Sequence, residues 1–300
     1  MKRLLVTGRH GFVGSTLIRM VGNEPALATW TVAPLAEQFE ILDARSVAQV
    51  VRETAPEAVL HLAARSSVAE SLHDPEGTIN VNLFGTLNLL RALADVGFTG
   101  PIVFVSSGDV YGRVPEDALP IDERRIPMPR NPYAVSKLAA EALCYQWFAT
   151  AGLRVVIARP FNHIGPGQGE QFAMPAFARQ INEIRNGGRK PVVAVGDVDV
   201  TRDFTDVRDI ILAYFSLLDR GRPGETYNVC SGVERTVRSM LERLIELAQV
   251  DVEIVKDETR MRPAEHRRAV GDPAKIFEAT GWRATMPLDE SLAAMLDASR

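Results

Sequence analysis

The sequence predicts an α/β protein with a doubly wound parallel sheet and a smaller C-terminal α/β lobe. Short apolar runs alternate with helical patterns through the first half of the 300-residue chain. Such alternation is typical of right-handed β-α-β crossovers, which build a parallel sheet covered by helices on both faces. Beyond Arg159 the alternation loosens into turn-rich segments. We place the first lobe at residues 1–160, with segments near 198–222 returning to it, and the second lobe mainly at 161–300.

The composition excludes several classes of protein. Hydrophobic residues make up 46% of the chain, and a net charge of −4 without long Lys or Arg runs argues against a nucleic-acid partner. No apolar stretch approaches the roughly 18 residues of a membrane span, and the first residues are too polar for a signal peptide. Cys144 and Cys230 show neither metal-ligand spacing nor a disulfide framework. We therefore expect a cytoplasmic protein with no metal centre and no membrane partner.

A glycine-rich turn follows the first expected strand, Arg3–Thr7, and precedes a helix expected from Thr16. Glycines let a backbone approach phosphates closely, and the start of a helix offers free N–H groups and a positive dipole. The glycine spacing departs from the G-x-G-x-x-G dinucleotide fingerprint, although the position between strand and helix is the same. The turn predicts a dinucleotide site whose ligands are Gly8, Arg9, Gly11, Phe12 and Gly14.

The second expected strand, Ala28–Ala33, bears on which dinucleotide binds. An Asp or Glu near the end of this strand would bind the ribose 2′-hydroxyl of NAD. The strand ends instead in Ala33 and Pro34, and Arg9 in the glycine turn can supply a cation for a 2′-phosphate. The sequence therefore favours NADP(H), with NAD(H) as the alternative if Arg9 is only a solvated loop residue.

The fourth expected strand, Ala58–Leu62, runs into Ala63 and Ala64. Small residues at the carboxyl end of a parallel strand leave room for a ligand where the strand order reverses. The first lobe is thus predicted to be a Rossmann-type dinucleotide-binding domain, and the second lobe to bind the substrate. His61, inside the apolar strand, is expected to be a core residue with satisfied hydrogen bonds rather than a catalytic one.

One helix start combines two residues suited to proton transfer. Asn131 is a favourable N-cap and Pro132 suits the first helical position, so a helix is expected to begin here. Such a helix carries Tyr133 and Lys137 on one face, a single turn apart. An ammonium beside a phenol favours the phenolate and lowers the tyrosine pKa, which suits general acid–base catalysis. Taken alone, this spacing is a weak signal, and a solvated helix face is the favoured explanation of the pair.

Nine motifs carry a resemblance over essentially the full length of the chain. In sequence order they are TGRHGFVGS, HLAA, NVNLFGTLNLL, VSSGDVYG, NPYAVSK, ARPFNHIGPGQ, TRDFTDV, YNVCSG and RMRPAE. With these motifs the chain resembles the extended short-chain dehydrogenase/reductase family, whose members act on nucleotide sugars. The resemblance implies that Tyr133 and Lys137 are catalytic, together with Ser107 at the end of the strand before their helix.

The resemblance also implies a reaction and further cofactor contacts. Ser107 would hold the sugar C4 oxygen while Tyr133 protonates it as hydride arrives from the nicotinamide. Lys137 would also bind the nicotinamide ribose. Glu40 and Ile41, after a third short strand, fall where the family contacts adenine. The other implied cofactor-site residues are Ala63, Ala64 and Asn82, the last in a supporting role.

Within the family, the motifs are most similar to those of members that reduce GDP-4-keto-6-deoxy-D-mannose to GDP-D-rhamnose. A GDP-sugar needs cations for its diphosphate, and the resemblance implies Arg202 and Arg262 for this role. Glu265 would accept hydrogen bonds from the nucleotide ribose, and Asn162 would bind the sugar or diphosphate. The implied substrate-binding residues are Ser107, Asp109, Asn162, Arg202, Arg262 and Glu265.

Asp109 bears on the competing activities. In 4,6-dehydratases, the resemblance places a Glu two residues before the motif tyrosine, here Tyr111, to remove the C5 proton and eliminate the 6-hydroxyl. Asp109 is one methylene shorter, which weighs against dehydration without excluding it. The alternatives to a reductase are a GDP-mannose 4,6-dehydratase, an NDP-hexose 4-epimerase and, more remotely, a nicotinamide-binding sensor that turns nothing over.

The helix that begins at Pro132 also predicts the oligomeric state. Leu138, Ala142 and Cys144 are expected on the face of this helix that lies away from the site. In the family this surface commonly pairs two subunits through a four-helix bundle. We therefore expect a homodimer.

Overall fold

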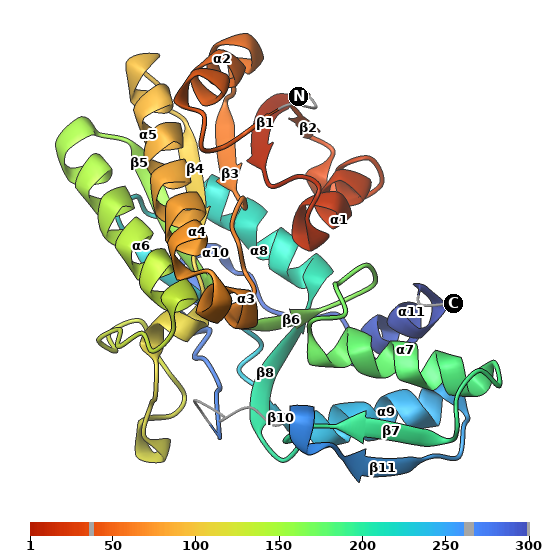
Figure 1. Cartoon of the computed structure of the whole chain (residues 1–300). Helices are drawn as coiled ribbons and strands as arrows, with labels where there is room; N and C mark the ends of the chain where they lie inside the picture. The colour runs from red at the N-terminus through yellow and green to blue at the C-terminus, as the bar shows by residue number, and fades with distance from the viewer. Residues whose placement is uncertain (36–38, 261–266, 299–300) are drawn as a thin grey trace.

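The computed structural model describes residues 1–35, 39–260 and 267–298, which fold into two lobes (Figure 1). The main lobe is built on a parallel sheet in the order β2-β1-β3-β4-β5-β9. This confirms the doubly wound sheet, and the strand order reverses at β1, between β2 and β3. The strands of this sheet are β1 (Lys2–Thr7), β2 (Trp30–Val32), β3 (Ala58–His61), β4 (Pro101–Val105), β5 (Arg154–Pro160) and β9 (Thr226–Val229).

Helices cover both faces of the sheet because successive residues of each buried strand point to opposite sides. Leu4 and Val6 of β1 pack in one core with the helices of the first face, whereas Leu5 packs in another core with those of the second. The first face is covered by α1 (Phe12–Val21) and α8 (Val207–Arg220), and the second by α2 (Ala44–Thr54), α5 (Gly85–Asp95) and α6 (Pro132–Ala151).

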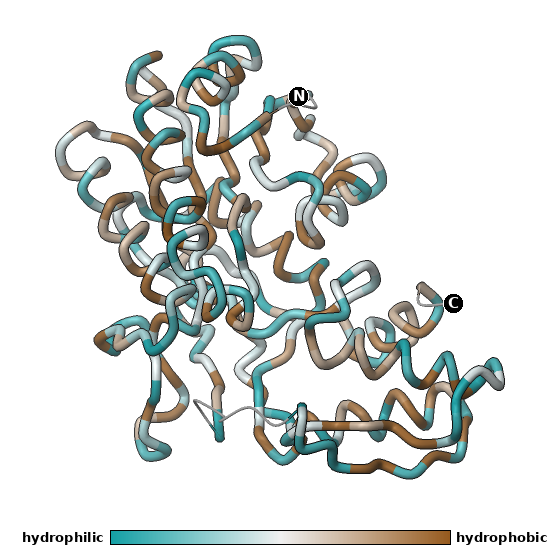
Figure 2. Tube along the Cα trace, in the orientation of Figure 1, coloured by the Kyte–Doolittle hydropathy of each residue, from teal (hydrophilic) through white to brown (hydrophobic). Residues whose placement is uncertain are grey.

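The second lobe has a core of its own (Figure 2), in which hydrophobic segments of α7, α9, α11 and β7 meet. Two small sheets accompany these helices, with the orders β10-β8-β6 and β11-β7. The elements of this lobe are β6 (Asn162–Ile164), α7 (Ala173–Arg185), β7 (Val192–Val195), β8 (Thr201–Asp206), β10 (Glu234–Thr236), α9 (Val237–Ala248), β11 (Glu253–Lys256), η5 (Glu258–Arg260) and α11 (Leu288–Ala298).

Short helical segments connect these elements. Among the described residues, no helix combines the length and the apolar character that crossing a bilayer requires. The segment η2 is a π-helical turn, and the remaining η segments are 3-10 turns. These connecting elements are η1 (Pro25–Leu27), α3 (Val68–His73), α4 (Pro75–Ile79), η2 (Asn80–Phe84), η3 (Gly108–Tyr111), η4 (Glu116–Ala118) and α10 (Ala274–Thr280).

The structure corrects two sequence-based expectations about these elements and leaves a third untested. The helix after the glycine turn begins at Phe12 rather than Thr16, because Gly11 already serves as its N-cap. Thr226–Val229, which we assigned to the second lobe, pairs with β5 as the edge strand of the main sheet. The third short strand expected before Glu40 falls mostly outside the described residues and stays a prediction. From Glu40 onward the chain turns, and the Glu40 carboxylate accepts the Leu42 N–H at 3.1 Å.

Candidate active site

The glycine turn joins β1 to α1 and is packed against the end of β3. Gly8 has a φ of +72°, which L side chains rarely adopt, and a Cβ there would lie 2.7 Å from the backbone nitrogen of Ala63. A Cβ at Gly14 would collide with the backbone oxygen of Gly8. The Ala63 N–H donates to Thr7 Oγ1 at 3.2 Å and ties the two strand ends together. The fold thus brings Gly8, Gly14 and Ala63 into one bare-backbone cradle.

The start of α1 gives this cradle its affinity for anions. No side chain caps the helix at Gly11, and its first turn holds no acidic residue. The first N–H groups and the positive end of the helix dipole are therefore available to a phosphate. Within the described residues, the buried Nε of Arg9 has no hydrogen-bond partner. A cradle that only glycine fits, with a cation beside it, suits the pyrophosphate of a dinucleotide.

Three predicted cofactor residues have other partners in the structure. The ring of Phe12 stacks on His163 of β6, with ring centroids 6.0 Å apart, so it joins the glycine turn to the second lobe. The Ile41 side chain lies in the core against α5, where a Cβ on Gly85 would lie 2.9 Å from its Cγ1. The Glu40 carboxylate bonds within its own turn. Side-chain contacts to adenine from these residues stay predictions.

The start of α6 forms as predicted. The Asn131 Oδ1 accepts the Ala134 N–H at 2.8 Å, and Pro132 occupies the first turn. Tyr133 is 8% exposed and Lys137 3% exposed. The alternative of a solvated helix face is therefore wrong, because both polar side chains are buried beneath the carboxyl edge of the sheet.

Burial dominates the protonation of this pair. It raises the pKa of Tyr133, nearby Asp109 raises it further, and a hydrogen bond with Ser107 opposes the rise. Burial likewise lowers the pKa of Lys137 to about 8, and the ammonium lies 4.8 Å from the centroid of the Phe104 ring. The expectation that Lys137 lowers the pKa of Tyr133 is therefore wrong for the protein alone. Desolvation of the phenolate is the largest cause of the shift, and Lys137 is not among its causes.

Two of the predicted substrate residues lie on the second-lobe side of the site. Asn162 at the start of β6 and Arg202 of β8 line a pocket of about 500 Å³. Apolar side chains such as Phe177 and Val200 line the same pocket, whose margin includes Arg260. Arg262 and Glu265 lie outside the described residues. The pocket is suited to a ligand with a flat apolar part and an anionic part.

Sequence reasoning missed a set of buried hydroxyls between these groups. His61 has both ring nitrogens bonded, Nδ1 to Thr7 Oγ1 at 2.6 Å and Nε2 to Thr86 Oγ1 at 2.9 Å, which confirms it as a satisfied core residue. Asn82 holds the backbone of Arg65 through two hydrogen bonds and Ser136 through a third. His61, Asn82 and the hydroxyl residues Thr7, Thr86 and Ser136 lie within quoted motifs, but the motifs do not indicate which of these residues pair, because the partners are distant in sequence.

Comparison with known proteins identifies the family. The sequence model described as GDP-mannose 4,6 dehydratase matches residues 5–295. The chain belongs to the GDP-mannose 4,6-dehydratase family. This membership confirms the resemblance to the extended short-chain dehydrogenases/reductases.

The chain is similar to relatives that are named for different activities on GDP-sugars. The GDP-6-deoxy-D-mannose reductase of Pseudomonas aeruginosa is 49% identical over 98% of this chain and 96% of its own. The GDP-6-deoxy-D-talose 4-dehydrogenase of Aggregatibacter actinomycetemcomitans is 30% identical over 93% of this chain and 91% of its own. The structure of RMD from Pseudomonas aeruginosa complexed with NADPH matches with a TM-score of 0.94 and 48% identity, covering 100% of this chain and 99% of that one.

Asp109 lies close to both Ser107 and Tyr133. It lies in η3, and its backbone N–H donates to Ser107 Oγ at 3.1 Å. The carboxylate is half-buried and acts electrostatically on Tyr133. The Asp109 carboxylate is therefore close to Tyr133, and its effect on the choice between reduction and dehydration stays a prediction.

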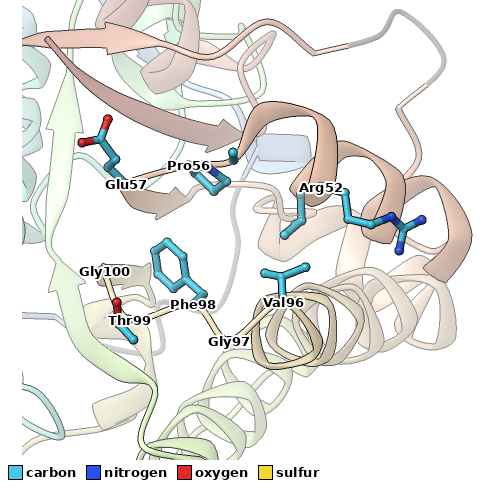
Figure 3. A pocket seen from close by; sticks show the side chains of 10 residues that line it. Arg52, Pro56, Glu57, Val96, Gly97, Phe98, Thr99 and Gly100 are labelled. Atoms are coloured by element: carbon cyan, nitrogen blue, oxygen red, sulfur yellow. The ribbon is translucent and has the colours of Figure 1, made fainter.

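A second pocket of about 500 Å³ lies on the opposite edge of the sheet, at the amino ends of β3 and β4 (Figure 3). Figure 3 shows Phe98, Val96 and Pro56 along its border, with Arg52 and Glu57 nearby. In the described part of the chain, no predicted site residue lines this pocket. Because ligands of doubly wound sheets bind at the carboxyl ends of the strands, the candidate active site is at the other edge.

Proposed function

We propose that the protein reduces the C4 ketone of GDP-4-keto-6-deoxy-D-mannose with NADPH and forms GDP-D-rhamnose. The observation that carries the reaction type is the buried Tyr133, which shares a hydrogen bond with Ser107 and retains its proton at neutral pH. The choice of substrate rests on the 49% identity to a GDP-6-deoxy-D-mannose reductase over nearly the whole chain.

The roles of the catalytic residues follow from proton balance. Bound NADPH supplies the hydride that converts the C4 carbonyl into an alkoxide. Tyr133 then gives up its phenolic proton: its O–H bond breaks as the O–H bond of the product C4 hydroxyl forms. Ser107 holds the reacting oxygen by hydrogen bonding. Lys137, on the same helix face, stabilises the tyrosinate that is left.

The cofactor preference is proposed from the glycine turn. Arg9 carries a buried guanidinium nitrogen without a partner among the described residues, so it is suited to bind the 2′-phosphate of NADP(H). The strand that would place an acid beside the ribose is β2, and its three residues are Trp30, Thr31 and Val32. That a relative was solved with NADPH supports the same assignment. NAD(H) remains the alternative cofactor.

For the sugar nucleotide, we assign the diphosphate to Arg202 and Arg262 and the sugar end to Asn162. Asn162 and Arg202 line the same pocket, and Arg260 at its margin directly precedes the segment that contains Arg262 and Glu265. Arginine suits this role because its planar fork binds phosphate oxygens in pairs.

We also propose that the protein forms a homodimer through the outer face of α6. Val135 and Tyr145 are exposed on this face, 44% and 58% respectively, beside the half-buried Leu138. Two such aromatic and aliphatic side chains favour burial against a second copy. Cys144 is fully buried in the core, so our expectation that it lies on this face is wrong. The cytoplasmic location stays a prediction.

The deciding experiment follows the absorbance of reduced cofactor while the purified protein receives GDP-4-keto-6-deoxy-D-mannose and NADPH. We expect consumption of one NADPH for each sugar reduced. The family model favours a second candidate, GDP-mannose 4,6-dehydratase. Conversion of GDP-mannose without added reductant, together with a flat NADPH trace, would establish that function instead. Binding of NADPH without turnover of either sugar would indicate a sensor.

A further inference from the structure

We propose that His61 is a positioning residue that aligns the Tyr133 helix with the glycine turn. It does so through a series of hydrogen bonds in which every donor lies on the glycine-turn side and every acceptor on the Tyr133 side. From the glycine turn to α6, the chain contains Thr7, His61, Thr86, Asn82 and Ser136, and it ends on the carbonyl oxygen of Tyr133. This inference rests on the proposed function, because turnover is one of its readouts.

The direction of the chain is set at Thr86. Its hydroxyl lies 2.6 Å from the carbonyl oxygen of Asn82 and 2.9 Å from His61 Nε2. A carbonyl oxygen can only accept, so the single hydroxyl proton of Thr86 points to Asn82. Thr86 Oγ1 must therefore accept from His61, which requires a proton on Nε2.

The other ring nitrogen completes the assignment. Burial lowers the pKa of His61 to about 3, with the Lys137 charge as a smaller cause, so the ring is neutral and Nδ1 carries no proton. Nδ1 then accepts from the Thr7 hydroxyl at 2.6 Å. Thr7 Oγ1 accepts in turn from the Ala63 N–H at 3.2 Å. The imidazole thus bridges the ends of β1 and β3 to α5 with a fixed tautomer.

The chain reaches the catalytic helix through Asn82 and Ser136. Asn82 Nδ2 donates to Ser136 Oγ at 2.8 Å, and the Ser136 hydroxyl donates to the Tyr133 carbonyl at 2.7 Å. The same amide holds the backbone of Arg65, which follows Ala63 and Ala64 in the cofactor cradle. From Thr7 to Ser136, every member of the chain is 2% exposed or less.

The consequence is a fixed spacing between the cradle and the phenol. Hydride transfer needs the nicotinamide, which the cradle positions, and Tyr133 in register with each other. A misplacement of about 1 Å can cost around a hundredfold in rate. Removing one hydroxyl from this hydrogen-bond series leaves a buried donor and a buried acceptor unpaired. The glycine turn and the start of α6 are then no longer held at a fixed spacing. Turnover is then expected to fall more than substrate affinity does.

Thr86→Val tests this inference, with Thr86→Ser as the rescue. We expect Thr86→Val to lower kcat about 10–100-fold while the KM for the sugar nucleotide changes about threefold at most. Thr86→Ser keeps the hydroxyl and should restore most of kcat. The matched control is Thr280→Val in α10. Its hydroxyl also donates to the carbonyl four residues earlier, at 2.7 Å, and accepts a backbone N–H, at 3.1 Å.

Thr280→Val should lower thermal stability as Thr86→Val does and leave kcat unchanged. Equal kcat values in the two variants would overturn the inference. If Thr86→Val does not fold, Ser136→Ala breaks the last link and carries the same expectation. The ¹⁵N NMR signals of His61 give a readout that needs no turnover. A neutral ring protonated on Nε2 at about pH 5 is expected. An imidazolium, or a neutral ring protonated on Nδ1, would refute the assigned hydrogen-bond series. This result would hold even if the protein had no reductase activity.

Discussion

Tyr133 and Lys137 lie one helical turn apart on α6, and burial moves both of their pKa values toward the neutral form. The phenol becomes a weaker acid, while the pKa of the ammonium falls to about 8. A reductase benefits from this arrangement because its tyrosine must hold a proton until the alkoxide forms. The direction of the Tyr133 pKa shift therefore supports its proposed role as proton donor.

Tyr133→Phe removes the only proton of this side chain that can be donated. We expect turnover to fall by about 10²–10⁴-fold while NADPH binding changes little, because the ring still fills its buried site. Stopped-flow absorbance with a parallel fluorescence titration of NADPH separates the two effects. Tyr111→Phe is a useful control, because the Tyr111 hydroxyl has a different partner from the Tyr133 phenol. It donates to Asn228 Oδ1, and these two atoms are 2.7 Å apart. Full activity of Tyr133→Phe would remove this residue from the role of acid.

The depressed pKa of Lys137 predicts how stability depends on pH. Between about pH 8 and pH 10, the unfolded chain holds a proton on this lysine that the folded chain does not. Its contribution to the free energy of unfolding therefore rises with pH across this window and is flat below it. Urea unfolding of wild type and Lys137→Met at several pH values measures the difference. The variant should lose this rise, gain stability near pH 7 and lose activity; parallel curves would contradict the prediction.

Arg9→Ala tests the cofactor preference. Loss of one charged hydrogen-bonding partner for the 2′-phosphate should weaken NADPH binding about 10–100-fold and leave NADH binding unchanged. Calorimetric titration with the two cofactors gives both constants. Equal losses for NADPH and NADH would instead assign Arg9 to the shared pyrophosphate.

Arg202→Ala tests the diphosphate assignment. We expect GDP affinity to fall about 10–100-fold with no change for NADPH, since Arg202 lies in the second-lobe pocket. Arg238→Ala is the matched control, because that arginine also belongs to the second lobe but pairs with Asp199 at 2.7 Å. A loss of affinity confined to NADPH would mean that Arg202 binds a phosphate of the cofactor rather than the diphosphate of the sugar nucleotide.

Tyr145→Glu tests the proposed homodimer. A buried charge on the shared face of α6 should convert a dimer into a monomer in sedimentation velocity at micromolar concentration. The control is Val255→Glu on β11, which is 38% exposed on the second lobe and should leave the assembly unchanged. A monomeric wild type would refute the interface directly.

The parallel sheet and the start of α6 could be predicted because their signals are local. An alternating strand pattern, or the Asn131-Pro132 pair at a helix start, is complete within a few residues. The protonation of Tyr133 could not be predicted in the same way. It depends on the desolvation imposed by distant segments and on Asp109, and the nearby lysine that the sequence makes obvious is not among the causes of the shift. Sequence spacing predicts that Tyr133 and Lys137 share one helix face, whereas their pKa values depend on the residues packed around them.

The same distinction explains the hydrogen bonds of His61. An apolar strand predicts a satisfied histidine, and the structure supplies both partners. Their identity requires the register of β1 against β3, in which Thr7 pairs with His61, and the packing of α5. A single sequence contains no signal for either partner.

The chain leaves the main sheet after β5, builds β6, α7, β7 and β8 of the second lobe and returns through α8 and β9. Val103 of β4 and Val156 of β5 share a core with Ile210 and Tyr214 of α8, and β9 closes the edge of the sheet beside β5. A fragment that ends at residue 160 therefore lacks α8, one of the two helices that cover the first face, and the last strand of the sheet. The nucleotide-binding half cannot complete its own core, so synthesis must pass residue 229 before cooperative folding of that half is finished.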